Sequence, residues 1–196
     1  MGTLTFYAIR FTICQPSRTT YGRAPPQSKI SNPKSQMETW QGTVVSVFIA
    51  PEAGAAMQAV EAARAIPGSG LEGDRYFDGK GAFSRWPGPH REVTLIAEEG
   101  LAAMEEETGI VFPAAASRRN VLVRGVPLND LVDRTFQVGE VQMRGIQLAQ
   151  PCKYLARISE EPAVLPGLVN RGGLRARILT EGTIRVGDVV EEAARV

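Results

Sequence analysis

Residues 134–150 have the sequence RTFQVGEVQMRGIQLAQ, and this stretch indicates the fold class most directly. Apolar and polar residues alternate on both sides of Gly139-Glu140, and a glycine beside a polar residue is typical of the turn between two antiparallel strands. A similar segment, GLRARILTEGTIRVGDVVEE (173–192), has Glu181-Gly182 near its middle. We predict a pair of strands in each segment.

The preceding part of the chain adds more short elements. The patterns predict strands at 42–50, 93–97 and 118–125, a helix at 98–109, and a turn or single helical turn at 128–132. Segment 55–66 is ambiguous, because its alanines favour a helix while its length and the glycines after it also suit a strand. Short strands separated by glycine turns predict a mainly β fold with a few short helices, a barrel rather than a parallel sheet.

The N-terminal region differs in composition from the rest. Residues 15–36, QPSRTTYGRAPPQSKISNPKSQ, are rich in proline, serine, glutamine and basic residues, so they offer almost nothing to a core. We predict a disordered extension at 1–36 and one domain at 37–196. Met37 suggests that the extension is a mis-assigned start, and a genuine flexible tail is the alternative. Mass spectrometry of the native N-terminus separates the two.

Deletion of residues 1–36 is expected to leave the melting temperature within about 2 °C, because the segment has little apolar surface to bury. Differential scanning calorimetry of the full and shortened chains measures this. A decrease of about 5 °C or more would show that the extension packs on the domain.

Charge and cysteine content narrow the class of protein. The net charge of +1 gives no general attraction to nucleic acid or to acidic membranes. No run approaches the roughly 18 apolar residues that would span a bilayer. Cys14 and Cys152 are the only cysteines, and no CxxC spacing indicates zinc or a disulfide framework. We therefore expect a cytoplasmic protein that acts on a small molecule and binds neither nucleic acid nor membrane.

Cys152 is the first candidate for chemistry. It follows Pro151, where the predicted strand ends, and begins the helix-like segment CKYLARI (152–158). The amides of a first helical turn, together with Lys153, would favour the thiolate, which can act as a nucleophile, a persulfide carrier or a soft metal ligand. The alternative is a small residue that only packs. His90 is the only histidine, which excludes a histidine-rich metal site.

Two further groups could bind an anion. The segment GSGLEGDRYFDGKGAFSR (68–85) combines five glycines with Asp74 and Arg75, and glycine lets backbone amides approach a ligand closely, although a plain surface loop also fits. Arginines form the second group, at Arg118 and Arg119 before Asn120 and at Arg171 in NRGGLRAR. We predict that Arg119 and Arg171 contact one phosphate. The alternating Arg175 and Arg177 suit a solvated strand face.

In this order and spacing, the motifs resemble the MOSC domain family, named for the C-terminal domain of molybdenum cofactor sulfurase. The resemblance runs from about residue 42 to 192. It rests on GLEGDRY (70–76), VTLI (93–96), RRNVLV (118–123), QPC (150–152) and GTIRVGDVV (182–190). It implies a β-barrel with a strand, not a helix, at 55–66. The form is that of a small standalone member.

The resemblance also implies a site. Cys152 would be the functional thiol, ligating the molybdenum of a pterin cofactor or carrying sulfur. The cofactor-binding residues would be Arg118, Arg119, Asn120 and Arg171, with Asp74 and Arg75 from the glycine-rich loop. At the family level, pyridoxal phosphate binding is also associated with this domain.

Two function classes follow from the resemblance. One is a molybdoenzyme that reduces N-hydroxylated compounds with electrons from a separate reductase, since the chain has no flavin or iron–sulfur motif. The other is a non-redox cofactor-binding or sulfur-carrier module, which would receive sulfur from a donor desulfurase as a Cys152 persulfide. The sequence does not separate them.

Overall fold

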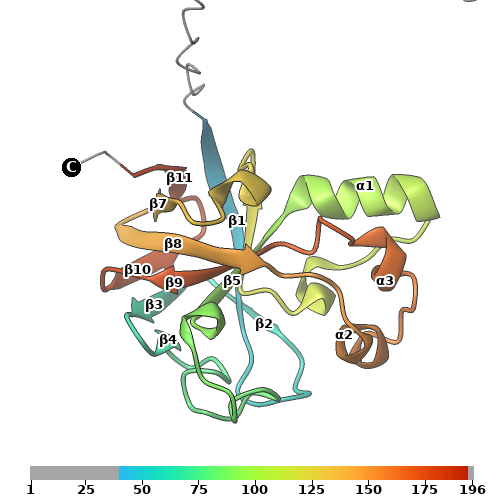
Figure 1. Ribbon diagram of the computed structural model, residues 1–196, viewed down its shortest axis with the longest axis horizontal. Helices are drawn as coiled ribbons and strands as arrows, with labels where there is room; N and C mark the ends of the chain where they lie inside the picture. Colours follow the sequence, from blue (N-terminus) through green and yellow to red (C-terminus); the bar gives the residue numbers. More distant parts are fainter. Residues whose placement is uncertain (1–39, 194–196) are drawn as a thin grey trace, which may run out of the picture. The chain divides into compact units, whose positions relative to one another are not determined.

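The computed structural model of the protein describes residues 40–193 (Figure 1). The predicted disordered extension, residues 1–36, lies outside the described residues. Within them the fold is mainly β, as the alternating patterns predicted.

Seven strands form a closed barrel. Their order is β11-β7-β8-β9-β5-β6-β1, and β1 also pairs with β11, which closes the ring. Neighbours are antiparallel except β5 and β6. The barrel strands are β1 (Gln41–Ile49), β5 (Val93–Ala97), β6 (Val121–Arg124), β7 (Thr135–Val138), β8 (Val141–Leu148), β9 (Leu174–Ile178) and β11 (Val189–Glu192).

The ambiguous segment 55–66 forms strands. It contains β2 (Gln58–Val60), which pairs with β1, and β3 (Ala62–Ile66). The strand β3 lies between β10 (Gly182–Arg185) and β4 (Gly70–Leu71) in a separate three-stranded sheet. Ala63 and Ala65 are buried while Arg64 is exposed. The alanines therefore follow the two-residue period of a strand, whatever their helix propensity.

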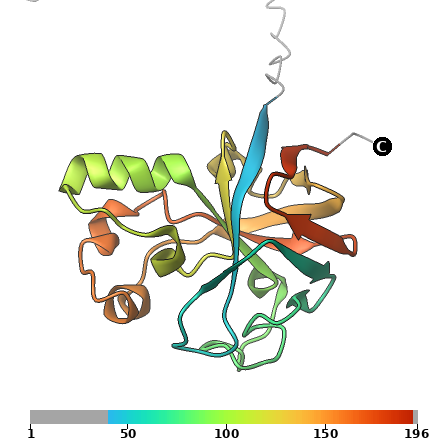
Figure 2. The ribbon, with the colours of Figure 1, turned by 180° about the vertical axis from the view of Figure 1, so that it is seen from behind.

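Helices lie together on one side of the barrel (Figures 1 and 2). They are α1 (Glu98–Thr108), α2 (Lys153–Ile158) and α3 (Val164–Gly167). Met104, Leu155 and Leu168 bury their side chains in one apolar cluster that joins them. The helix predicted at 98–109 is confirmed, and Gly109 ends it with a φ of 70°. Short 3-10 turns occur at η1 (Pro89–Arg91), η2 (Ala114–Ser117) and η3 (Leu128–Leu131).

The barrel interior holds the main core. Its fully buried side chains come from all around the ring and include Val44, Val47, Leu95, Val121, Phe136, Met143, Leu174, Ile178 and Val190. Alternate positions along each strand therefore point inward, as the sequence pattern indicated. The glycine-rich loop and α2 lie over part of the outer face of the barrel, and the site described below is formed there.

One predicted pair of strands is wrong. Residues 173–192 contain three strands, and β9 and β10 do not pair with each other. Instead β9 pairs with β5 and β8, while β10 pairs with β3. After β9 the chain stays bonded to β8, because Leu179 N donates to Gln142 O, so it cannot fold back as a hairpin. By contrast, the pair predicted around Gly139-Glu140 is confirmed as β7 and β8.

The strand predicted at 118–125 begins later than expected. β6 starts at Val121, so Arg118, Arg119 and Asn120 precede it. Arg118 has a φ of 60°, a left-handed conformation that no residue inside a strand adopts. The next residue, Arg119, donates a hydrogen bond to Ala149 O, just after the end of β8.

Candidate functional site

Cys152 lies at the junction predicted for it. β8 ends at Leu148, Cys152 is the N-cap residue of α2, and its side chain is exposed. The thiol belongs to a pocket between the glycine-rich loop, α2 and the outer face of the barrel. The pocket is lined by Arg75, Tyr76, Ala82, Phe83, Thr94, Arg118, Arg119, Gln150, Cys152, Tyr154, Leu155 and Arg175. The structure thus brings together four predicted residues: Arg75, Arg118, Arg119 and Cys152.

Arg119 is deeply buried in this pocket, with 9% of its surface exposed. Its Nε donates to Gly172 O at 2.7 Å and its Nη2 to Ala149 O at 2.8 Å. The pKa of Arg119 is lowered to about 10, mainly by burial. The nearby charge of Arg175 is the second cause and also lowers this pKa, while Cys152 raises it. Because both partners are neutral carbonyl groups, the charge itself is not compensated by them.

Arg118 and Arg75 form a second basic pair in the wall. Arg118 Nη1 donates to Ala55 O at 2.8 Å, whereas its Nη2 is buried without a hydrogen-bond partner in the described part of the chain. Burial lowers the pKa of Arg118, and the charge of Arg75 adds to that effect. Arg75 donates to Arg118 O at 3.1 Å and pairs with Asp74 at 2.9 Å.

Asp74 and Asn120 lie behind the pocket wall, not on it. The Asp74 carboxylate accepts hydrogen bonds from the backbone N–H groups of Ala50 and Tyr76 and from Asn120 Nδ2. Asn120 Oδ1 accepts from Thr94 Oγ1 at 2.8 Å. These buried groups are used up within the protein, so neither residue offers the direct cofactor contact predicted for it. They hold Arg75 and the glycine-rich loop in place.

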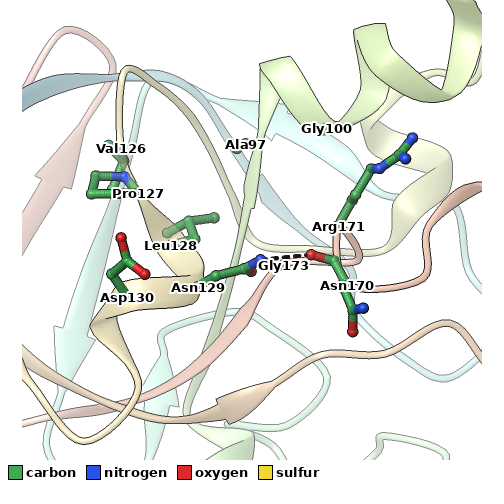
Figure 3. A pocket seen from close by; sticks show the side chains of 10 residues that line it. All are labelled: Ala97, Gly100, Val126, Pro127, Leu128, Asn129, Asp130, Asn170, Arg171 and Gly173. Atoms are coloured by element: carbon green, nitrogen blue, oxygen red, sulfur yellow. Dashed lines mark hydrogen bonds between the residues drawn. The ribbon is translucent and has the colours of Figure 1, made fainter.

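Arg171 is separated from the Cys152 pocket. Its guanidinium pairs with Glu107 of α1 at 2.7 Å. The residue lines a different cavity of about 220 Å³, between the start of α1, η3 and the turn at 170–173. Figure 3 shows the Arg171 side chain pointing away from Leu128 and Asn129, which line the same cavity. The geometry therefore does not offer the predicted joint contact of Arg119 and Arg171 with one phosphate.

The glycines after Arg171 have a structural explanation. A Cβ on Gly172 would overlap Ala149 O, and one on Gly173, where φ is 102°, would overlap Leu95 O. They let the turn pack directly against the end of β8 and against β5.

Sequence reasoning missed Arg175 and the aromatic residues of the pocket. Arg175 was expected on a solvated face, yet it lines the pocket and its Nη1 lies 3.4 Å from His90 O. Burial lowers the pKa of Arg175. Arg177, two residues along the same strand, remains exposed, 3.8 Å from Glu92. The two arginines are two residues apart and so lie on the same face of the strand, and no sequence signal distinguished them.

The ion pairs of the barrel show what is unusual about this pocket. Six arginines outside the pocket pair with carboxylates, namely Arg64, Arg124, Arg144, Arg171, Arg177 and Arg185. Within residues 40–193, Arg118, Arg119 and Arg175 form no such pair. The pocket therefore combines an exposed thiol with positive charges that the described protein does not neutralise, an arrangement suited to an anion.

Residues 40–193 contain no cluster of three or more His, Cys, Asp or Glu side chains that could hold a metal ion. No helix in the same range is long and apolar enough to cross a membrane.

The closed barrel with a cysteine at the strand-to-helix junction defines a known class of domain. The family model described as the MOSC domain matches residues 84–191. The chain therefore belongs to the MOSC domain family. No curated protein sequence matches the chain.

Solved structures share the fold. The YuaD protein from Bacillus subtilis is 16% identical with a TM-score of 0.65, and the match covers 78% of this chain and 97% of YuaD. YiiM from Geobacillus stearothermophilus is 18% identical (TM-score 0.60, covering 78% and 75%). YiiM from Escherichia coli is 19% identical (TM-score 0.57, covering 81% and 71%). At these identities the similarity concerns the fold alone.

Proposed function

We propose that this MOSC protein binds a molybdenum cofactor through Cys152 and reduces N-hydroxylated compounds with electrons from a separate reductase. The observation that supports the proposal is the set of unneutralised arginines beside an exposed thiol. Membership of the MOSC family, which is associated with the molybdenum cofactor, agrees with it.

The residues of the pocket suit such a group chemically. A buried guanidinium without a counter-ion is costly, and a donor without a partner, such as Arg118 Nη2, adds about 1–3 kcal/mol. A phosphate would offset both costs, because guanidinium groups bind phosphate oxygens with paired, charge-assisted hydrogen bonds. Arg118, Arg119 and Arg175 would hold the anionic part, and the Cys152 thiolate is a soft metal ligand.

The bound cofactor would supply two-electron redox chemistry at its metal. The overall reaction takes two electrons and two protons, converts an N–OH group to N–H and releases water. The chain would position and enclose the reactants. Arg119 donates hydrogen bonds to Ala149 O, which lies between β8 and Cys152, and to Gly172 O in the turn beside it. These bonds hold the thiol at a defined place in the pocket wall.

The exposure of Cys152 also favours a second candidate function. A thiol at an open pocket mouth is accessible to a protein that donates sulfur, so Cys152 could carry a persulfide without redox turnover. The cations of the pocket would stabilise the persulfide anion in the same way as a thiolate.

One experiment separates the candidates. Protein made in a host competent for the cofactor is analysed for molybdenum, for pterin and for sulfur released by cyanide, and is tested for reduction of an N-hydroxylated base with a viologen donor. Bound metal with turnover supports the enzyme, and released sulfur without metal supports the carrier. The absence of metal, pterin and releasable sulfur would overturn both.

A matched pair of variants on β9 tests the role of the charges. Arg175→Gln is expected to weaken cofactor binding about tenfold or more, since a hydrogen bond to a charged group contributes about 1.5–3 kcal/mol. Arg177→Gln should change it less than about twofold, because Arg177 lies outside the pocket. Release of pterin, followed by its fluorescence during dialysis, measures both. Equal effects of the two variants would remove Arg175 from the site.

A further inference from the structure

Two arginine and three aromatic side chains form a continuous row beside Cys152. Arg91 Cζ lies 5.9 Å from the centre of the Tyr76 ring and 5.3 Å from that of Phe83. The Phe83 ring meets the Tyr154 ring edge-on at 5.5 Å, and Arg157 Cζ lies 5.7 Å from the Tyr154 ring. We call these five side chains the entrance row.

The entrance row belongs to the pocket. All three of its rings line the pocket together with Cys152. The contact between Phe83 and Tyr154 joins the glycine-rich loop to α2, the helix that Cys152 caps. A molecule bound in this pocket would therefore contact these rings as well as the thiol.

The two arginines of the row retain free hydrogen-bonding capacity. Arg91 Nε donates to Trp86 O, and within residues 40–193 neither Arg91 nor Arg157 pairs with a carboxylate. A guanidinium stacked on a ring keeps its outer N–H edge available in its own plane, where it can bind a carboxylate or another oxyanion with two hydrogen bonds. The ring faces offer flat apolar contact beside that edge.

The geometry points to a binding subsite for small planar anions at the entrance row, with an aromatic ring that bears a carboxylate or a comparable oxyanion as the ligand class. The pocket lining adds three arginines without a carboxylate partner among residues 40–193, Arg118, Arg119 and Arg175, and no acidic side chain, so cationic compounds are repelled. The inference about substrates rests on the proposed function: an enzyme with this subsite would select acidic aromatic N-hydroxylated compounds. The inference about anion binding requires neither metal nor cofactor.

The test uses the cofactor-free chain with Cys14→Ser, in which Cys152 is the only thiol. Two aromatic disulfides probe it: dithiobis(nitrobenzoate), in which each planar ring bears a carboxylate, and dithiodipyridine, which is uncharged. The combined substitution Arg91→Gln and Arg157→Gln is expected to slow the reaction of Cys152 with the dicarboxylate about five- to tenfold. The rate of its reaction with the uncharged reagent should change less than twofold. About 1 M salt, where the Debye length is about 3 Å, should reduce the difference.

Phe83→Ala is the second variant, since it removes the ring on which Arg91 rests, and it should also lower the ratio of the two rates. Arg177→Gln is the matched control, an exposed arginine outside the row, and should leave the ratio unchanged. The uncharged reagent reports whether the thiol itself has changed. A decrease shared by both reagents, or no decrease in the arginine variant, would overturn the subsite. Neither result depends on whether molybdenum binds, so the proposed function succeeds or fails separately.

Discussion

Replacement of Cys152 by serine is expected to remove molybdenum retention, or sulfur loading under the alternative function, while the fold stays intact. A serine hydroxyl is not ionised near neutral pH and is a hard oxygen ligand, so it does not replace a thiolate toward a soft metal site. Loss of residues that only support a metal ligand already costs 10–100-fold in affinity, so loss of the ligand itself should cost at least about 100-fold.

Metal and cyanide-released sulfur per protein chain measure this effect after extensive desalting. The exposed Cys152 side chain contributes little to packing, so the free energy of unfolding should change by less than about 0.5 kcal/mol. Cys14→Ser serves as the control, with unchanged metal and sulfur content. Equal molybdenum and sulfur in the Cys152→Ser protein and its parent would place the functional group elsewhere.

Substitution Asp74→Ala is expected to give the largest loss of stability, about 3–5 kcal/mol. Asp74 is 3% exposed and accepts hydrogen bonds from two backbone amides, Asn120 and Arg75. Alanine would leave the buried Arg75 guanidinium without its anion, and an unpaired buried charge is costly. Urea unfolding of parent and variant measures the loss as a lower midpoint at constant m value.

Asp78→Ala is the matched control in the same loop. Asp78 pairs with Lys80 at 3.5 Å on the surface, and such pairs contribute no more than about 1 kcal/mol. Asp74→Asn should fall between the two, because the amide keeps an acceptor oxygen but not the charge. A loss below about 1 kcal/mol for Asp74→Ala would show that Arg75 finds another partner after the change.

The architecture could be predicted from local patterns to a large extent. Alternation over 134–148 predicted β7 and β8, and the glycine at 139, with a φ of 55°, occupies their turn. The prediction failed at 173–192, where a glycine near the middle suggested a hairpin. Which strands pair there depends on the bonds of Leu179 to β8 and of β10 to β3, across more than 35 residues of chain, and a local pattern does not contain that information.

The sequence indicated which residues to consider for the site better than it indicated how those residues are arranged. The junction around Cys152 could be recognised because a proline follows the strand pattern and a helical spacing begins after it. Asp74 and Asn120 were predicted to bind the cofactor, but the sequence could not show that their polar atoms are bonded to Ala50, Tyr76 and Thr94. Hydrogen-bond partners distant in the chain decide whether a polar residue binds a ligand or supports a loop.

By itself, then, the sequence determined the class of fold, the family resemblance and the position of the thiol, because each depends on residue types at short spacing. Only the tertiary structure decided which arginines surround that thiol. Arg175 and Arg177 point to the same side of β9, and the pocket wall covers the first but not the second. Arg171 is turned toward Glu107 on α1. The burial of a charge depends on what packs over it, and that is a property of the assembled chain.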